Sequence, residues 1–260
     1  MAMAHVNTAV NPCGEGTWET VLVAGHPVDV YEPPRPHKEG AVLLYLHGVH
    51  LNRLHDKAAF VAEFDRYRVP VVAPLTQRSW WTDRICREFD PVVSAQTHLL
   101  DRVIPFIKER FGVSPPQIGL FGASMGGQGA LRLAYKFPQL FPVVAAISPA
   151  IDYHLRMREG DETLPLMYED EEQARQDTAL LHIHPLNWPR KQFFCCDPTD
   201  ERWWNSVDRL RMKLWSLGVP FECDLETSGG GHSFEYYGKM AAKTIRFLVE
   251  RLEEERRRVV

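Results

Sequence analysis

Short apolar runs alternate along the chain with segments in which apolar residues return at a helical spacing. Residues 41–48 (AVLLYLHG) are almost entirely apolar and end in glycine, a pattern typical of a strand buried on both faces. Similar runs predict further strands at residues 69–74, 117–122, 142–148, 191–196 and 220–227. Residues 20–33 predict an N-terminal hairpin that turns at residues 25–27.

Helices are expected between these strands. The helical repeat predicts them at residues 57–68, 100–111, 125–137 and 201–217, with a last helix after residue 232. Pro105 lies inside the second of these, so we expect a kink or an early helix start there. Repeated strand–helix units predict an α/β fold, in which a mostly parallel central sheet is flanked by helices on both faces. We expect residues 1–260 to form a single domain.

The alternation breaks down at residues 151–190. This segment is polar, is interrupted by prolines and carries only short helical patches. It falls between the sixth and seventh expected strands, so we interpret it as an irregular, lid-like insertion that forms either a lid or a wall over a site.

Composition narrows the classes of function. The 260 residues are 45% hydrophobic and 25% charged, as in ordinary globular proteins. A net charge of −4 gives no basic surface for nucleic acid, and no apolar run approaches the roughly 20 residues of a membrane span. The N-terminus shows no signal-peptide pattern, and the five cysteines are odd in number and lack a C-x-x-C motif. We therefore expect a cytoplasmic protein with free thiols, and a homo-oligomer is compatible with the sequence.

The segment GASMGG (residues 122–127) lies between a predicted strand and a predicted helix. It fits G-x-S-x-G, the nucleophile elbow of α/β-hydrolases, in which a sharp turn projects the serine above the end of the sheet. Gly122 and Gly126 are expected because a Cβ at either position would collide with a neighbouring strand or helix. Gly127 is expected to let the helix start pack closely. Ser124 is the candidate nucleophile.

A serine hydroxyl needs a base and a group that orients this base. His232 lies in the glycine loop SGGGHSF before the last helix, which can carry an imidazole over the serine. Asp197 and Asp200 both follow the strand at 191–196. Asp200 is preferred as the acid, whereas Asp197, which precedes a proline, is more simply explained as a turn cap.

An oxyanion would be held by two backbone N–H groups. The loop after the strand at 41–48 supplies one, at Val49, and the residue after the serine, Met125, supplies the other. The helix N-terminus beneath Ser124 also favours negative charge.

Taken in order, the motifs LHG, GASMGGQGALRLAYKFPQLF, ISPAIDY and GGGHSF resemble the putative-esterase branch of the α/β-hydrolases. This branch includes esterase D-type S-formylglutathione hydrolases, feruloyl and acetyl esterases, and mycolyltransferases. The resemblance covers roughly residues 40–250 and implies Ser124 as nucleophile, Asp200 as acid and His232 as base. This chain has VHLNRLHDK after the oxyanion loop, where esterase D proteins carry a cysteine, so formylglutathione is not implied as the substrate.

Three residues are candidates for substrate binding. Trp80 and Trp81 lie in a loop that should reach the same sheet edge as Ser124, either as an aromatic wall of the pocket or as a pair that packs the loop down. His50 is expected to line the pocket. The histidines at 47, 50 and 55 share no helical face and have no carboxylate at a signature interval, so no metal is predicted.

The sequence therefore predicts a serine esterase that acts on small-molecule esters through an acyl-enzyme and needs no cofactor. The same residues would serve an acyltransferase or a peptidase. A non-catalytic binding protein on an α/β-hydrolase scaffold is the alternative from another class, although a binder would not need all three catalytic groups.

Overall fold

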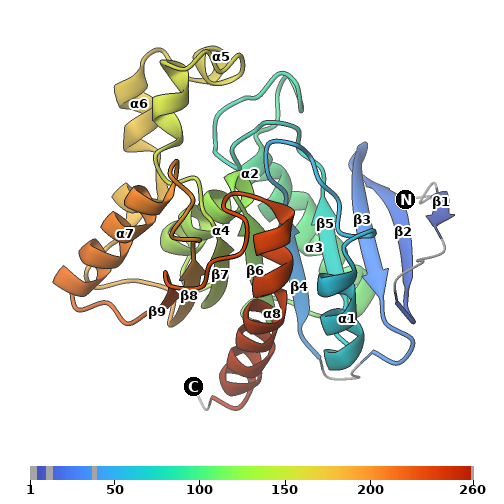
Figure 1. The fold of residues 1–260 in the computed structure, drawn as a ribbon. Helices are drawn as coiled ribbons and strands as arrows, with labels where there is room; N and C mark the ends of the chain where they lie inside the picture. The colour runs from blue at the N-terminus through green and yellow to red at the C-terminus, as the bar shows by residue number, and fades with distance from the viewer. Residues whose placement is uncertain (1–4, 10–13, 37–39, 259–260) are drawn as a thin grey trace.

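The computed structural model describes residues 5–9, 14–36 and 40–258. Its centre is a nine-stranded sheet with the strand order β1-β2-β3-β5-β4-β6-β7-β8-β9 (Figure 1). The strands are β1 (His5–Ala9), β2 (Thr17–Val23), β3 (His26–Glu32), β4 (Val42–Leu46), β5 (Val71–Pro74), β6 (Ile118–Ala123), β7 (Val143–Ile147), β8 (Lys191–Cys195) and β9 (Glu222–Asp224).

The sheet is mostly parallel, as the sequence predicted. Strands β5, β4, β6, β7, β8 and β9 pair in parallel, while β1, β2 and β3 form an antiparallel edge that joins them through β3 and β5. The expected N-terminal hairpin is β2–β3, with Val23 opposite His26 at its turn. Strand β1 was not expected, so the insertion at residues 151–190 lies between β7 and β8 in the observed numbering.

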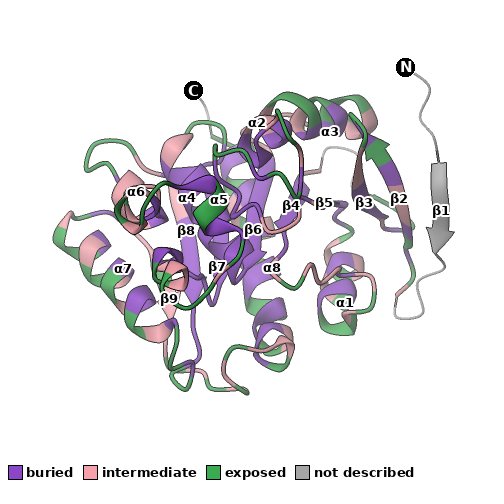
Figure 2. Cartoon of the chain, turned by 90° about the horizontal axis from the view of Figure 1, so that it is seen from above, coloured by how far each residue is buried: buried purple, intermediate pink, exposed green. Residues whose placement is uncertain are grey.

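Helices cover both faces of the sheet (Figure 2). They are α1 (Ala58–Tyr67), α2 (Ala95–His98), α3 (Ile104–Phe111), α4 (Met125–Lys136), α5 (Leu164–Met167), α6 (Glu171–Gln176), α7 (Trp204–Ser216) and α8 (Phe234–Arg256). Helices α1 and α8 pack on one face, while α2, α3, α4 and α7 pack on the other. Within the described ranges, no helix is both long and apolar enough to cross a membrane.

The irregularity expected at Pro105 is confirmed. A turn of π-helix, η1 (Leu99–Val103), stands directly before α3, and Pro105 occupies the first turn of α3. Proline has no N–H and its ring crowds the carbonyl four residues earlier, so a wider turn before it relieves the conflict.

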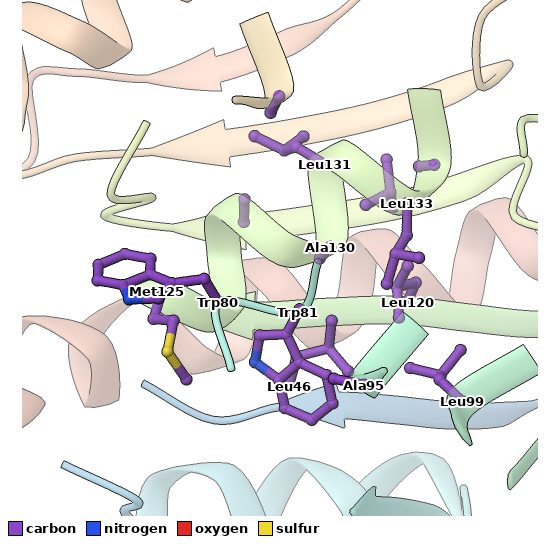
Figure 3. Packing of buried hydrophobic residues seen from close by; sticks show 14 of the residues in the cluster. Leu46, Trp80, Trp81, Ala95, Leu99, Leu120, Met125, Ala130, Leu131 and Leu133 are labelled. Atoms are coloured by element: carbon purple, nitrogen blue, oxygen red, sulfur yellow. The ribbon is translucent and has the colours of Figure 1, made fainter. Parts of the chain in front are cut away.

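Helix α4 is the most deeply buried helix of the fold. Every residue from Met125 to Tyr135 is buried. Figure 3 shows Met125, Ala130 and Leu131 of this helix among the apolar side chains of its neighbours. Because α4 begins at the residue after Ser124, this packing fixes the start of the helix on which the candidate nucleophile depends.

The insertion is packed into the core at its base. It contains α5, α6 and the 3-10 turns η2 (Tyr153–Met157) and η3 (Ala179–His182), which matches the short helical patches expected. Arg132 of α4 is 1% exposed and donates hydrogen bonds to the Asp177 carboxylate at 2.5 and 2.9 Å. Gln128 of the same helix accepts the Ala179 N–H at 2.8 Å. The insertion is thus anchored on the helix that follows the candidate nucleophile.

Candidate active site

Ser124 occupies a strained turn between β6 and α4. Its backbone has φ 55° and ψ −119°, a conformation that L-residues rarely adopt without support from their surroundings. The Ser124 N–H donates to the Ile147 carbonyl at 3.0 Å, and the Ser124 carbonyl accepts the Ala150 N–H at 3.0 Å. Strand β7 and the loop after it therefore hold the serine in place from the side.

Two glycines make this turn sterically feasible. A Cβ on Gly126 would overlap the Leu46 carbonyl oxygen of β4, and a Cβ on Gly122 would overlap the backbone of Gly126. A Cβ on Gly127 would lie 3.2 Å from the Ile147 carbonyl oxygen, which is a tighter fit than most side chains meet. The collisions predicted from the GASMGG segment are therefore present, and the helix packs directly on the sheet.

Ser124, His232 and Asp200 form a hydrogen-bonded row. The Ser124 Oγ lies 2.8 Å from His232 Nε2, and His232 Nδ1 lies 2.7 Å from Asp200 Oδ2. An ionised carboxylate only accepts, so Nδ1 donates and Nε2 is left to accept the serine proton. Asp200 is buried, and its other oxygen accepts the Trp203 N–H at 3.1 Å. The structure brings together the three residues that the sequence selected.

Asp197 holds the loop that carries the histidine. Its Oδ2 accepts the N–H groups of Gly229 and Gly231 at 2.6 and 2.9 Å, and its Oδ1 accepts the Thr199 N–H at 2.7 Å. Burial alone would raise the pKa of this carboxyl, but these hydrogen bonds stabilise the charged form and hold the pKa well below its usual range. The turn-cap interpretation of Asp197 is confirmed, and its reach to the glycine loop is an additional finding.

His47 fixes the loop in which Val49 lies. The Thr76 N–H donates to His47 Nε2 at 3.1 Å, which leaves Nδ1 to donate to the Gly48 carbonyl at 2.9 Å. Burial lowers the pKa of His47 to about 4, so the ring is neutral near pH 7 and this pattern persists. The carbonyl and the N–H of a trans peptide point in opposite directions, so holding the Gly48 carbonyl also fixes the direction of the Val49 N–H.

A cavity of about 210 Å³ opens beside Ser124. Val49 and His50 line it, as the sequence predicted for His50. Met125 is the first residue of α4, so its N–H has no acceptor within its own helix. The cavity is also lined by residues that the sequence did not indicate, namely Tyr45, Gly48, Asn52, Ala123, Ser233, Phe234 and Tyr237.

Of the two interpretations of Trp80 and Trp81, the aromatic wall is wrong, because neither residue lines this cavity, and packing of the loop is confirmed. Both side chains are completely buried. Trp80 stacks on Tyr153 of the insertion with 4.7 Å between ring centroids. Trp81 donates its indole N–H to the His47 carbonyl at 3.1 Å and packs where Gly129 leaves room on α4 (Figure 3). The pair packs its loop between α4 and the insertion.

Among the described residues, no group of three or more histidine, cysteine, aspartate or glutamate side chains is placed to hold a metal ion. Cys86, Cys195, Cys196 and Cys223 are free thiols, while Cys13 lies outside the described residues.

Comparisons with known proteins give a family and a fold. The family model described as "Putative esterase" matches residues 25–214. The S-formylglutathione hydrolase from Agrobacterium tumefaciens is similar in structure, with a TM-score of 0.75 at 17% identity over 95% of this chain and 99% of that chain. A ferulic acid esterase gives a TM-score of 0.68 at 16% identity over 96% and 99% of the two chains.

A third similar structure is the fluorophosphonate-binding serine hydrolase F of Staphylococcus aureus. Its TM-score is 0.69 at 15% identity, over 95% of this chain and 98% of that chain. A search of curated protein sequences found no match. At such low identities the structural neighbours establish the fold, and the α/β-hydrolase fold predicted from the sequence is confirmed.

Proposed function

The chain belongs to the family of α/β-hydrolases described as putative esterases, and from this premise we propose that it cleaves carboxylic esters through an acyl-enzyme. Ser124 is the nucleophile, His232 is the general base and Asp200 orients the imidazole. The observation that carries the proposal is the row of two hydrogen bonds, 2.8 Å from Ser124 Oγ to His232 Nε2 and 2.7 Å from His232 Nδ1 to Asp200 Oδ2. A scaffold retained only for binding has no need of this alignment.

The first half-reaction forms the acyl-enzyme. Ser124 Oγ attacks the ester carbonyl carbon while its proton passes to His232 Nε2, and the buried Asp200 carboxylate stabilises the imidazolium. The tetrahedral intermediate collapses, the carbon–oxygen bond to the alcohol breaks, and His232 gives its proton to the departing alcohol. In the second half-reaction His232 takes a proton from water, the resulting hydroxide attacks the acyl carbon, and Ser124 leaves with that proton.

The oxyanion of both intermediates is stabilised by the backbone N–H groups of Val49 and Met125. Each such donor contributes about 3–4 kcal/mol to transition-state stabilisation when it is aligned in advance. The contacts of His47 support this assignment, because they fix the Gly48–Val49 peptide before any substrate arrives. The N-terminus of α4 carries the positive end of the helix dipole, which also favours the negative charge of the oxyanion.

The substrates of this site are small molecules. A cavity of about 210 Å³ accommodates a small group beside the scissile bond, so a short acyl or alcohol group fits better than a long chain. Hydrolases of glutathione thioesters and of ferulic esters stand among the structural neighbours, which supports ester or thioester cleavage.

A fluorophosphonate probe tests the proposal. It should add one phosphonyl group to wild-type protein at Ser124 and none to Ser124→Ala, as read by intact mass and peptide mapping. Ser148→Ala is the matched control, because Ser148 also follows a central strand, has a positive φ of 42° and is buried. Labelling of Ser124→Ala at the wild-type rate, or no labelling of the wild type, would contradict the proposal.

A further inference from the structure

Two phenols line the cavity beside Ser124 and have no part in the proposed mechanism. Tyr45 lies on β4, two residues before His47, and Tyr237 lies in the first turn of α8. Both line the cavity. Tyr237 packs edge-on against His232 with 5.6 Å between ring centroids, so its ring also borders the proposed general base. The strand and the helix each bring one hydroxyl to this region.

The Tyr45 hydroxyl is buried and unpaired. Its side chain is 2% exposed, and its oxygen has no hydrogen-bond partner among the described residues. Buried tyrosine hydroxyls normally have a partner, because a buried polar group that lacks one destabilises the fold. Phenylalanine would preserve the packing of this ring on Phe121, at 5.1 Å between centroids, without that cost. The hydroxyl therefore needs an explanation that the folded chain alone does not provide.

The Ser233 hydroxyl is also unpaired on a residue that lines the cavity, but it has a local explanation. Its Oγ lies 3.2 Å from the position that a Cβ on Gly230 would take, so it turns toward its own loop. Tyr45 lies instead in the middle of the sheet, on β4 between β5 and β6.

Both phenols act as hydrogen-bond donors near neutral pH. Burial raises the pKa of the Tyr45 hydroxyl well above its usual value. Burial also raises the pKa of Tyr237, and the neighbouring Asp200 and Tyr45 add to that rise.

We infer that the Tyr45 hydroxyl binds a hydroxyl group that the substrate carries next to its scissile ester, so that short hydroxylated esters are the preferred substrate class. The inference rests on the proposed esterase function. The cavity has room for a small group, and a substrate hydroxyl would pair a phenol that lines it and that the fold leaves unpaired. An apolar group of the same size would leave that phenol buried and unpaired in the complex as well.

Two pairs of isosteric esters test the inference and distinguish the two sides of the substrate. In the first pair, ethyl glycolate is compared with ethyl propanoate, and the hydroxyl lies on the acyl side. In the second pair, 2-hydroxyethyl acetate is compared with propyl acetate, and the hydroxyl lies on the alcohol side. Acid release is followed in a pH-stat, and each kcat/KM is divided by the rate constant for hydroxide-catalysed hydrolysis of the same ester, which removes differences in intrinsic reactivity.

The expected result is a preference of about ten-fold for the hydroxylated ester in at least one pair, and its reduction to near one in Tyr45→Phe. Tyr45→Phe should also melt at or above the wild-type temperature, because it removes an unpaired buried hydroxyl, whereas a structural hydroxyl would lower it. Tyr236→Phe is the matched control: its hydroxyl is also buried and without a hydrogen-bond partner, but it does not line the cavity. It should keep the wild-type preference.

Wild-type ratios near one in both pairs would overturn the inference even if Tyr45→Phe failed to fold. So would a wild-type preference that survives in a folded Tyr45→Phe. If the wild type reacts with a fluorophosphonate but hydrolyses none of the four esters, this substrate class is wrong and the reactive serine stands. If it does neither, the proposed function itself fails.

Discussion

Asp197 and Asp200 lie three residues apart on the same loop, yet their carboxylates contact different partners. Asp200 accepts from the imidazole of His232, while Asp197 accepts backbone N–H groups from the loop on which that imidazole is mounted. One carboxylate orients the ring, and the other orients the loop. The sequence could rank the two by position after the strand, but the reach of Asp197 to a loop more than 30 residues later had no local signal.

Substitution separates the two roles. Asp200→Asn should lower kcat by about 10³–10⁴ with little change in melting temperature, because the amide no longer stabilises the imidazolium. Asp197→Asn should instead lower the free energy of unfolding by about 2 kcal/mol, since four hydrogen bonds lose their charged acceptor. Its kcat should fall less than that of Asp200→Asn. Ester hydrolysis and urea denaturation of both variants check this, and a larger loss of kcat in Asp197→Asn would reverse the assignment.

Trp80 and Trp81 are residues for which the sequence left two interpretations open, an aromatic wall of the pocket or a pair that packs its loop down. The position of the loop was predicted correctly, because Trp81 donates to His47 at the expected sheet edge. The choice between the two interpretations depends on the insertion, because Tyr153 stacks on Trp80 and closes it off from solvent. A tertiary contact between distant segments leaves no mark on the periodicity of either.

At the scale of elements, α4 and its glycines determine whether the nucleophile turn forms. Gly126→Ala places a methyl group on the Leu46 carbonyl oxygen, so β4 and α4 must separate. We expect this variant to be insoluble or to unfold well below the wild-type temperature.

Gly238→Ala provides the matched control for this prediction. Gly238 also lies inside a helix, but a Cβ there would meet only the Ala59 methyl group at an ordinary 3.5 Å. The substitution should therefore raise the free energy of unfolding by about 0.5–1 kcal/mol through helix propensity. Equal stability of Gly126→Ala and Gly238→Ala in thermal denaturation would contradict the steric account.

The insertion is expected to behave as part of the core at its base. Arg132→Met removes the buried partner of Asp177 and should lower the free energy of unfolding by about 3–5 kcal/mol. Asp177 would be left with Tyr168 and His182 as hydrogen-bond partners. Arg175→Met, which breaks the exposed pair with Glu172, should leave the urea midpoint almost unchanged. Similar midpoints for the two variants would show that the insertion is not anchored through Arg132.

At the scale of the whole molecule, the sequence predicted the central sheet, the helices on its two faces and the chain order of Ser124, Asp200 and His232. These were predictable because buried parallel strands, amphipathic helices and a glycine elbow each have their own local pattern. The cavity was not. Tyr45 lies in a strand buried along its whole length, and Tyr237 lies on the buried side of α8. Periodicity marks such residues as core and cannot show which of them faces a cavity.

The sheet also has one more strand at its N-terminal edge than the sequence predicted. Strand β1 pairs with β2 at the edge and adds a strand ahead of the predicted hairpin. Edge strands are short and lack the continuous apolar pattern of central ones, so they are the hardest strands to identify from sequence.

The central claim is that Ser124 cleaves short esters at the cavity beside it. The most direct test is kcat/KM for p-nitrophenyl acetate, butyrate and octanoate with wild type and Ser124→Ala. We predict turnover by the wild type that decreases from acetate to octanoate, because the cavity is only about 210 Å³, and loss of at least about 10³-fold in Ser124→Ala. Equal turnover by the two proteins, or none by the wild type with any of the three esters, would contradict the account.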